Sequence, residues 1–428
     1  MISIEVKACF DFLPEEETVG TLRYESVRGT AVYEFEYAGQ FLQKHKNLLI
    51  SADLNRYLGR QVVSGDIFSC FGDCLPDRWG KALIDKRERI LARQSNRPVR
   101  SFSDFDYMVR LDDRTRMGAF RFYHNDELIE VASDGRDIPI IANIGKLTQE
   151  SRLYEQSVID GKEPRDEWVD NLWRQGSSLG GARPKATVAD NDGNLWIAKL
   201  PSVRDTYDIA IWECFASELA RKAHICVPDT QVLPVLSLDY HVLLSRRFDR
   251  SGNKRIHYAS SLTLTGFKDG DGWENGKGYP DIADIIVGEA MVFEPEKNLE
   301  ELFRRVVFNI CIGNHDDHFR NHGFILTEKG WTLSPAFDMN PTNEDGQSIL
   351  VTSYTNMASI WDIYNASDDY LIEKNRAAYI IWQTLEAIKN WRTVARRCGI
   401  NSSEQQRFAA RLNNSLQELP RFRQLNGK

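Results

Sequence analysis

The densest run of acids, amides and imidazoles in this chain lies between two apolar segments. It extends from Gly313 to Asn321. Apolar residues recur at helical spacing before it, over Leu302–Cys311, and Gly323–Leu326 after it is typical of a strand. A polar loop between two regular elements is where a scaffold can hold reactive side chains rigidly. We therefore expect the chemistry of this protein to depend on the loop.

The spacing within and after the loop indicates which chemistry. Asp316 lies five residues before Asn321, and a further acid, Asp338, follows a short apolar segment. In protein kinases an aspartate orients the acceptor hydroxyl, an asparagine five residues later binds magnesium, and a downstream aspartate binds magnesium at the phosphates. The neighbouring residues differ from those of typical protein kinases: no arginine separates His315 from Asp316, and Met339 follows Asp338. The pattern predicts a divergent kinase site, although a polar turn that caps backbone groups would also explain it.

A glycine-rich segment upstream, Gly176–Lys185, precedes a hairpin that we expect to turn at Asp192–Gly193. Glycines let backbone amides approach an anion closely, and Arg183 and Lys185 add positive charge. This composition is typical of a phosphate-binding loop, but flexible connectors share it. Neither the dinucleotide-binding fingerprint nor the Walker A spacing is present.

The second strand of the hairpin, Trp196–Leu200, contains Lys199 among apolar residues. A buried ammonium group requires an anionic partner. The following predicted helix, Tyr207–Ala223, can supply Glu213, and a lysine–glutamate pair of this kind positions nucleotide phosphates in kinases. The alternative is that Lys199 reaches the strand edge and extends into water. A further strand, Tyr240–Ser245, is expected to end at a hinge whose backbone groups can contact an adenine edge.

The whole chain has the composition of a folded protein. Its 428 residues are 42% hydrophobic and 27% charged, which predicts a packed core, and the length suits two or three domains or one domain with a large accessory lobe. The formal net charge of -8 argues against a surface devoted to nucleic acid. Seven scattered cysteines without zinc-type spacing predict reduced thiols. With no signal-peptide pattern and no long apolar run, we expect a cytoplasmic protein that does not enter membranes.

Hydrophobic periodicity also predicts elements outside the loop. Alternation of period two favours three strands at the N-terminus, and amphipathic spacing favours helices before the glycine-rich segment and near the C-terminus. The predicted strands are Ile2–Phe10, Thr21–Tyr24 and Ala31–Tyr37, and the predicted helices are Leu147–Ile159, Trp168–Trp173, Tyr379–Trp391 and Glu404–Leu419.

Several motifs, taken together, resemble the HipA family of bacterial serine/threonine kinases, which are the toxins of type II toxin–antitoxin pairs. These motifs are Leu75–Gly80, Ser177–Lys185, Trp196–Lys199, Arg247–Arg250, Gly313–Asn321 and Asp338–Pro341. The resemblance implies an α+β fold: a protein-kinase-like two-lobed structure with a small β-rich N-terminal domain and a mainly helical C-terminal lobe. The implied domains are residues 1–135 for the β-rich domain, 136–250 for the part with the nucleotide loop, and 251–428 for the helical lobe.

The resemblance also implies roles for individual residues, with ATP and Mg²⁺ as cofactors. Asp316 matches the catalytic aspartate, Asn321 and Asp338 match the magnesium ligands, and Lys199 matches the lysine that contacts the phosphates. The implied nucleotide contacts are Ser178, Leu179, Gly180, Gly181, Ala182, Arg183, Lys185, Lys199, Arg246, Arg247, Phe248 and His318, with Glu213 and Asp249 in support. The self-phosphorylated serine of the family falls on Ser178, and Ser177 beside it is the alternative.

The partners implied by the resemblance are a protein substrate, such as an aminoacyl-tRNA synthetase or another translation component, and a helix-turn-helix antitoxin. DNA would be contacted only through that antitoxin. Two features differ from the family pattern: Asp317 lies beside Asp316, which leaves the catalytic aspartate ambiguous, and Arg183-Pro184 replaces a Gln-Glu pair found in some members. We expect His315 and His318 to brace the catalytic loop by hydrogen bonds. A small-molecule phosphotransferase and a non-catalytic regulatory partner of a DNA-binding antitoxin are the alternative functions.

Overall fold

The computed structural model describes residues 1–129, 138–176, 183–236, 238–288 and 292–427. The chain forms two compact units. Unit 1 consists of Met1–Asp208 and Gln231–Tyr258, and unit 2 consists of Ile209–Thr230 and Ala259–Lys428. The chain thus leaves unit 1, contributes one helix to unit 2, and returns. The three-domain division with boundaries near residues 135 and 250 stays a prediction.

Unit 1 begins with an antiparallel sheet in the order β4-β3-β2-β1-β5-β6. Its strands are β1 (Ile2–Ala8), β2 (Glu17–Val27), β3 (Thr30–Tyr37), β4 (Arg60–Ser64), β5 (Phe120–His124) and β6 (Glu127–Leu128). Alternate residues such as Val6, Leu22 and Phe35 are fully buried, as the period-two pattern requires. All three strands predicted at the N-terminus are present. Aromatic side chains from the short helices α1 (Gly39–Lys44), α2 (Ser69–Gly72) and α4 (Asp104–Met108) pack on this sheet.

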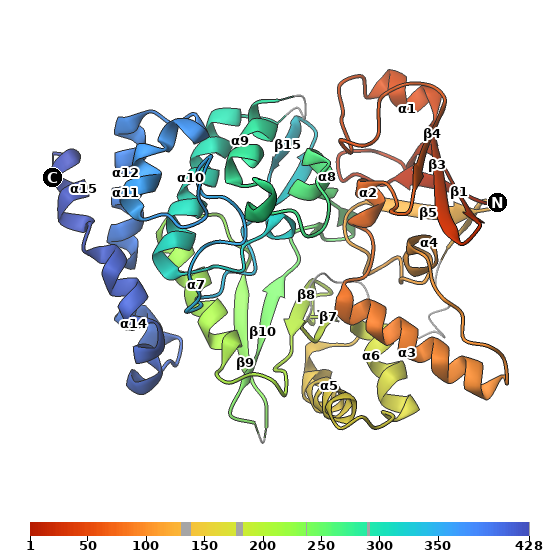
Figure 1. Ribbon diagram of the computed structural model, residues 1–428. Coiled ribbons are helices and arrows are strands. Elements are labelled where there is room, and N and C mark those ends of the chain that lie inside the picture. The colour runs from red at the N-terminus through yellow and green to blue at the C-terminus, as the bar shows by residue number, and fades with distance from the viewer. Residues whose placement is uncertain (130–137, 177–182, 237, 289–291, 428) are drawn as a thin grey trace. The chain divides into compact units, whose positions relative to one another are not determined.

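Three helices of unit 1 pack together and lie beside a second sheet (Figure 1). They are α3 (Arg78–Gln94), α5 (Ile144–Ile159) and α6 (Asp166–Gly176), and a short 3-10 helix, η1 (Ile141–Asn143), precedes α5. Their shared core includes Leu83, Tyr154 and Val169. Basic residues of α3 face acids of α6: Arg93 contacts Asp166 at 2.8 Å. The predicted helices at 147–159 and 168–173 are both confirmed.

The second sheet has the order β7-β8-β10-β9. Its strands are β7 (Lys185–Ala189), β8 (Leu195–Lys199), β9 (Thr230–Pro234) and β10 (His241–Arg246), and a small hairpin follows, β11 (Arg250–Ser251) with β12 (Lys254–Arg255). The predicted hairpin turn is confirmed, since Gly193 adopts φ 81° between β7 and β8. One face of this sheet packs apolar side chains such as Val188, Trp196 and Val242 against Leu147 of α5.

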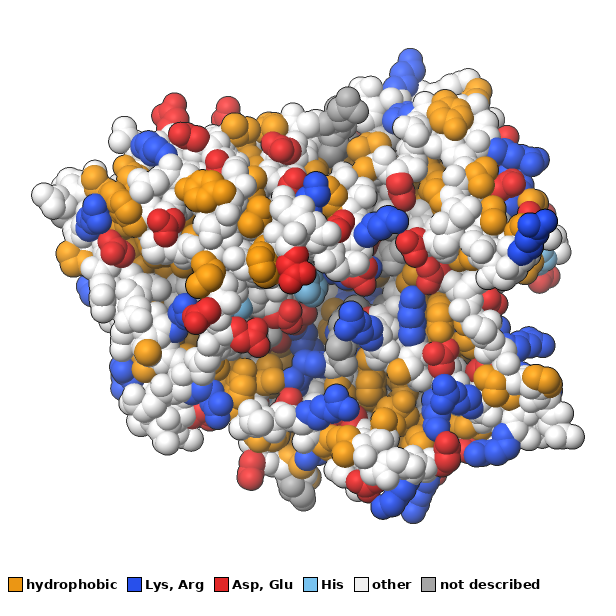
Figure 2. All heavy atoms as spheres, in the orientation of Figure 1, with side chains coloured by type: hydrophobic (Ala, Val, Ile, Leu, Met, Phe, Trp, Pro, Cys, Tyr) orange, Lys and Arg blue, Asp and Glu red, His pale blue; other side chains and the backbone are white. Residues whose placement is uncertain are grey.

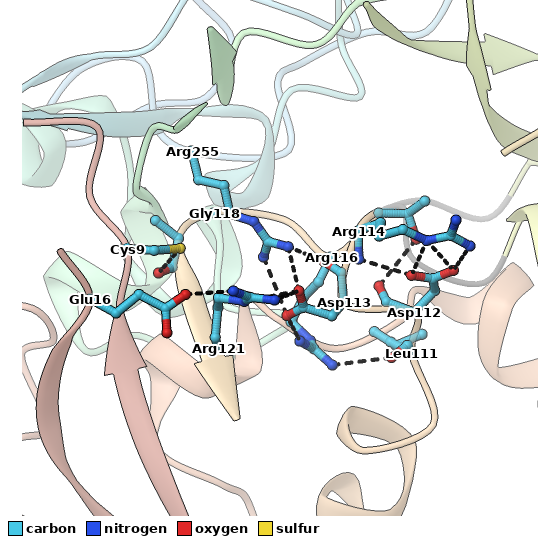
Figure 3. A network of polar contacts seen from close by, with 12 residues as sticks. Cys9, Glu16, Leu111, Asp112, Asp113, Arg114, Arg116, Gly118, Arg121 and Arg255 are labelled. Carbon is cyan, nitrogen blue, oxygen red and sulfur yellow. Dashed lines mark hydrogen bonds and ion pairs between the residues drawn. The ribbon is translucent and has the colours of Figure 1, made fainter. Parts of the chain in front are cut away.

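Charged side chains are buried inside unit 1 between its N-terminal part and the segment after β10 (Figure 3). Asp113 accepts hydrogen bonds from Arg116 at 2.8 Å and from Arg255 at 2.6 Å. Burial alone would raise the pKa of Asp113, but the guanidinium groups of Arg255, Arg116 and Arg121 hold it below its usual range. Because each buried carboxylate is paired with arginines, this network ties residues far apart in the sequence into one unit.

His257 lies in the same part of unit 1 and gives a pH-dependent prediction. Its ring contacts Phe10 and Phe120 at centroid distances of 5.1 and 4.3 Å, and its Nδ1 accepts the Ala119 N–H at 3.4 Å. Burial lowers the pKa of His257 to about 3. In the unfolded chain the histidine has a pKa of about 6.5, so between about pH 6.5 and pH 3 it binds a proton in the unfolded state and stays neutral in the folded state. The free energy of unfolding therefore decreases as the pH falls below about 6.5.

We therefore expect the free energy of unfolding to fall less steeply with acid in His257→Asn, whose amide oxygen can still accept the Ala119 N–H. The difference between the two proteins should change by about 1.4 kcal/mol per pH unit between about pH 6 and pH 4. Urea unfolding followed by tryptophan fluorescence at several pH values measures it. A difference that is constant with pH would show that His257 titrates normally in the folded protein.

Unit 2 is mainly helical. Its helices are α7 (Ile209–Lys222), α8 (Ser261–Thr265), α9 (Tyr279–Val287), α10 (Pro295–Ile312), α11 (Ile360–Asn365), α12 (Lys374–Ile388), α13 (Trp391–Arg397), α14 (Ser402–Leu416) and α15 (Leu419–Leu425), with 3-10 turns η2 (Trp273–Asn275), η3 (Phe319–Asn321) and η4 (Ser367–Tyr370). A three-stranded sheet has the order β13-β14-β15, with β13 at Tyr258–Ser260, β14 at Gly323–Thr327 and β15 at Gly330–Leu333. The predicted helices at 207–223, 302–311, 379–391 and 404–419 correspond to α7, α10, α12 and α14.

Helix α10 forms the centre of unit 2 and lies among α9, α11 and α12 (Figure 1). Its residues Leu302, Phe303, Val306 and Val307 are fully buried. Their spacing places them on adjacent turns of one helix, which explains why this run was recognisable in the sequence. The helix leads directly into the polar loop.

Acidic and basic side chains are interspersed on the face of the described residues that Figure 2 shows. None of the helices in the described part of the chain combines the length and the apolar character that a membrane span requires.

Candidate active site

The polar loop lies where the sequence places it, between α10 and β14. Helix α10 ends at Gly313, which adopts φ 75°. A Cβ atom at this position would lie 3.1 Å from the Thr342 carbonyl oxygen and 3.0 Å from the Arg411 side chain. Both the left-handed backbone and the close approach favour glycine here. The chain therefore turns sharply out of a rigid helix and presents the following acids from a fixed starting point.

The two adjacent aspartates of the loop have opposite environments. Asp317 is buried, and its Oδ2 accepts hydrogen bonds from Asn309 Nδ2 at 2.7 Å, from His322 Nε2 at 2.8 Å and from the Tyr279 hydroxyl. Burial would raise the pKa of Asp317, but His322 and these hydrogen bonds lower it. Asp317 is therefore an ionised brace inside unit 2 that a substrate cannot reach.

Asp316, in contrast, is exposed. The pKa of its carboxyl is raised, first by partial burial and then by the negative charges of Asp338 and Asp317, while His318 lowers it. Asp316 and Asp338 therefore lie close enough to interact electrostatically. The side chain of Asn321 donates to the Asp316 carbonyl oxygen at 3.0 Å. Unit 2 thus brings Asp316 and Asn321 of the loop near Asp338, the three residues that the kinase spacing singles out, and it leaves Asp316 as the accessible aspartate of the loop.

Asp338 has an unusual backbone conformation. Its φ of 61° lies in the left-handed region, which costs a non-glycine residue about 1–2 kcal/mol. The neighbours fix it: Met339 is buried, and the Asn340 N–H donates to Asn314 Oδ1 at 3.0 Å. Such strain persists where the surroundings impose it and is frequent at functional sites. Asn340 Nδ2 also donates to Glu213 Oε2 at 3.4 Å, so Glu213 of α7 lies beside this segment.

The two histidines of the loop differ. His315 Nδ1 is 2.8 Å from the Gly346 carbonyl oxygen, and Ser348 donates to the His315 carbonyl oxygen at 2.9 Å. This histidine braces the loop against residues 346–348. His318 Nδ1 is buried and has no hydrogen-bond partner among the described residues, and Asn340 Oδ1 shares that state. A site for a polar ligand contains buried polar atoms whose hydrogen-bond partner is the ligand, and these two atoms near Asp316 and Asp338 fit that description.

The oxygen donors of the loop suit magnesium. Among the described residues, no group of three or more His, Cys, Asp or Glu side chains is arranged to hold a metal ion. Magnesium in kinases needs no such group, because one amide and one carboxylate hold it while phosphate and water oxygens complete its octahedron. Asn321 and Asp338 would be that pair of donors in the predicted site, and the like charges of Asp316 and Asp338 are what a divalent cation would neutralise.

The second sheet of unit 1 carries two of the predicted nucleotide residues, Lys185 and Lys199, on one face. Since Ala186 and Ala198 point into the apolar core, their neighbours Lys185 and Lys199 point to the opposite face. The register pairs Lys185 directly with Lys199, and Lys199 in turn with Leu243 of β10. Directly opposed side chains have Cβ atoms about 5 Å apart. The two lysine side chains therefore start from adjacent points on one face, at the end of the sheet that adjoins the glycine-rich segment.

Carboxylates contact both cations that flank the glycine-rich segment. Lys185 Nζ lies 3.5 Å from Asp77 Oδ2, and both side chains are at least 95% buried. Arg183 donates to both carboxylate oxygens of Asp205, at 2.8 and 2.7 Å. The sequence did not indicate either acid as a partner, although Asp77 belongs to the Leu75–Gly80 motif. Loop residues Ser177, Ser178, Leu179, Gly180, Gly181 and Ala182 lie outside the described residues.

The adenine contacts assigned to Arg246, Arg247 and Phe248 stay a prediction, and the structure shows where these three side chains lie. The guanidinium of Arg247 is buried, pairs with Asp249 at 2.7 Å and donates to the Thr115 carbonyl oxygen at 2.6 Å. Its side chain thus belongs to the buried polar interior of unit 1, as does Asp249, so Arg247 can meet a base only through its backbone. Arg246 is exposed and donates to Asn194 Oδ1 at 3.0 Å, and Phe248 packs near Tyr258.

The lysine–glutamate pair stays a prediction, since Lys199 belongs to unit 1 and Glu213 to unit 2. The sequence did not single out the bracing residues Asn309, Tyr279 and His322. The sequence contains one indication for Asn309: this polar residue lies between Phe308 and Ile310 in an otherwise apolar part of α10, which is typical of a buried side chain with a hydrogen-bonding role. Tyr279 lies far from the loop in the sequence and gave none.

Comparisons with known proteins identify the relatives of this chain. Residues 177–417 match the family described as the HipA-like C-terminal domain. The serine/threonine-protein kinase toxin HipA of Shewanella oneidensis is 24% identical over 217 residues, which cover 45% of this chain and 50% of that protein. A candidate kinase of Sinorhizobium fredii, Y4dM, is 28% identical over 165 residues, covering 36% of this chain and 39% of that protein. The matched region spans half or less of the length of these curated relatives.

A solved structure shows the fold over the full length. HipA of Shewanella oneidensis, in complex with HipB and its operator DNA, superimposes with a TM-score of 0.67 and covers 99% of both chains at 16% sequence identity. This likeness confirms the predicted α+β, protein-kinase-like fold class.

Proposed function

The chain belongs to the HipA family, and from that premise we propose that it is an ATP- and magnesium-dependent serine/threonine protein kinase. One observation carries the proposal: within a single loop, the structure buries Asp317 and exposes Asp316 next to Asn321 and Asp338. A scaffold without catalytic activity has no physical need to hold like-charged carboxylates together. Kinase activity is also the property named for the Shewanella oneidensis relative.

In this proposal each residue has a distinct role. Asp316 orients the acceptor hydroxyl and accepts its proton during in-line attack, which requires positioning more than a strong base. Asn321 and Asp338 hold the metal ion, which when bound neutralises the phosphate charge. Lys199, with Lys185 beside it, contributes positive charge to the nucleotide phosphates. Asp317 keeps the loop fixed through its contacts with Asn309, Tyr279 and His322.

The acceptor and partners follow from the family. We propose a protein substrate in translation, such as an aminoacyl-tRNA synthetase, and self-phosphorylation at Ser178 or Ser177. The solved relative forms a complex with HipB and operator DNA. By analogy, this chain binds a helix-turn-helix antitoxin and meets DNA through it.

The magnesium assignment predicts a specific defect in Asp338→Asn. Loss of one anionic ligand should raise the magnesium concentration needed for half-maximal phosphoryl transfer by about tenfold or more. Transfer of labelled phosphate from ATP, measured across a magnesium titration, tests this. Asp345→Asn is the matched control, because Asp345 lies on the same segment but is 80% exposed and pairs with Arg411. Unchanged magnesium dependence in Asp338→Asn would remove Asp338 from the metal site.

A further inference from the structure

An acid of the N-terminal part of unit 1 touches the predicted nucleotide site. Asp77 is the N-cap of α3, where its Oδ1 accepts the Gly80 N–H at 2.6 Å. Its other carboxylate oxygen, Oδ2, lies 3.5 Å from Lys185 Nζ. That oxygen is buried and has no hydrogen-bond partner among the described residues. One carboxylate thus joins a helix start to the first residue of β7.

Charge balance on the sheet explains why this contact matters. Lys185 and Lys199 are directly opposed, and like charges directly opposite each other on a sheet destabilise it. Lys185 is also buried, so its ammonium needs an anion close by to remain charged. Asp77 supplies an anion in direct contact with it. Loss of the Asp77 charge would weaken the electrostatic balance between Lys185 and Lys199.

We propose that Asp77 is a positioning residue of the nucleotide site, holding the charged Lys185 ammonium beside Lys199 so that both meet the phosphates of ATP. The proposal rests on the proposed function, because it assumes that these lysines bind a nucleotide. It adds a role for the N-terminal part of the chain: the Leu75–Gly80 motif supplies the counter-ion for a phosphate-binding lysine. Asp77 itself contacts no substrate atom.

Asp77 carries the negative charge that this role requires at pH values above about 7. Burial raises the pKa of Asp77 to about 7, while Lys185 and the N–H groups of Gly80 and Trp79 counteract this rise. Asp77 is 4% exposed and directed at an ammonium group.

The test is Asp77→Asn in the full-length protein. Asparagine caps helices as well as aspartate does, so α3 should begin normally, and only the charge facing Lys185 is lost. We expect the KM for ATP, and the Kd for Mg-ATP measured by calorimetry, to rise about tenfold or more, with kcat changed by less than about threefold. Asp166→Asn is the control, since Asp166 pairs with Arg93 across α3 and α6 and should leave both constants unchanged.

A double-mutant cycle separates positioning from a general effect on folding. If Asp77 acts through Lys185, Asp77→Asn should add little to the loss already caused by Lys185→Met. Additive losses, or a KM for ATP that Asp77→Asn leaves unchanged or lowers, would overturn the proposal. The kinase function and the role of Asp77 can be rejected separately. A wild-type protein that binds no Mg-ATP contradicts the kinase function, whereas normal binding by Asp77→Asn contradicts only the role of Asp77.

Discussion

Replacing Asp316 by asparagine should lower the rate of phosphoryl transfer by about 1,000-fold or more. An amide has the size of the carboxylate but cannot accept the proton of the acceptor hydroxyl. Stability should change little, within about 0.5 kcal/mol, because Asp316 is exposed and its charge is repelled by Asp338 and Asp317. Transfer of label from ATP to protein gives the rate, and urea unfolding gives the stability.

Two further measurements make the result specific. The Kd for Mg-ATP of the Asp316→Asn protein should stay within a few-fold of the wild-type value, since Asp316 acts on the acceptor and not on the nucleotide. Asp345→Asn serves again as a matched exposed acid and should keep full activity. A fully active Asp316→Asn protein would exclude Asp316 as the catalytic aspartate.

Replacing the next residue, Asp317, by asparagine should mainly lower stability, whereas Asp316→Asn mainly lowers activity. Asp317→Asn is expected to lower the free energy of unfolding by about 3 kcal/mol, because a buried, ionised acceptor of three hydrogen bonds is replaced by a neutral group. The donors are Asn309, Tyr279 and His322, which fix the loop to α9, α10 and the start of β14. Urea unfolding of unit 2, followed by tryptophan fluorescence, measures the loss.

The pair of variants forms a reciprocal test, since both replace an aspartate by an asparagine within one loop. Asp316→Asn should lose activity and keep stability, whereas Asp317→Asn should lose stability. Some activity should also be lost in Asp317→Asn, at temperatures where the protein remains folded, because the loop is held less firmly. If Asp317→Asn proved as stable as the wild type while Asp316→Asn unfolded, the assignment of catalytic and bracing aspartates would have to be exchanged.

Local sequence patterns predicted much of the fold and part of the site. Alternation revealed β1 to β3, helical spacing revealed α7 and α10, and the Asp192–Gly193 turn revealed the β7–β8 hairpin. These features depend on residues close together in the chain, where periodicity follows directly from backbone geometry. The grouping of Asp316 with Asn321 was predictable for the same reason, since one short loop carries both.

Contacts between distant residues were not predictable in this way. Nothing near Asp77 in the sequence shows that it faces Lys185, and nothing near Asp317 shows that Tyr279 reaches it. The same holds for Arg247: its position after β10 did not show that its side chain turns inward to Asp249 and to the carbonyl oxygen of Thr115. The direction of a long side chain at the end of a strand depends on the charged groups that tertiary packing places around it.

The most direct test of the kinase account is the transfer of labelled γ-phosphate from ATP in a cell lysate, with and without magnesium, followed by separation of proteins from small molecules. The account predicts label on protein hydroxyls, including Ser177 or Ser178 of this chain, only with magnesium and only with an intact Asp316. Label that appears solely on small molecules, or on proteins at the same level with Asp316→Asn, would contradict it.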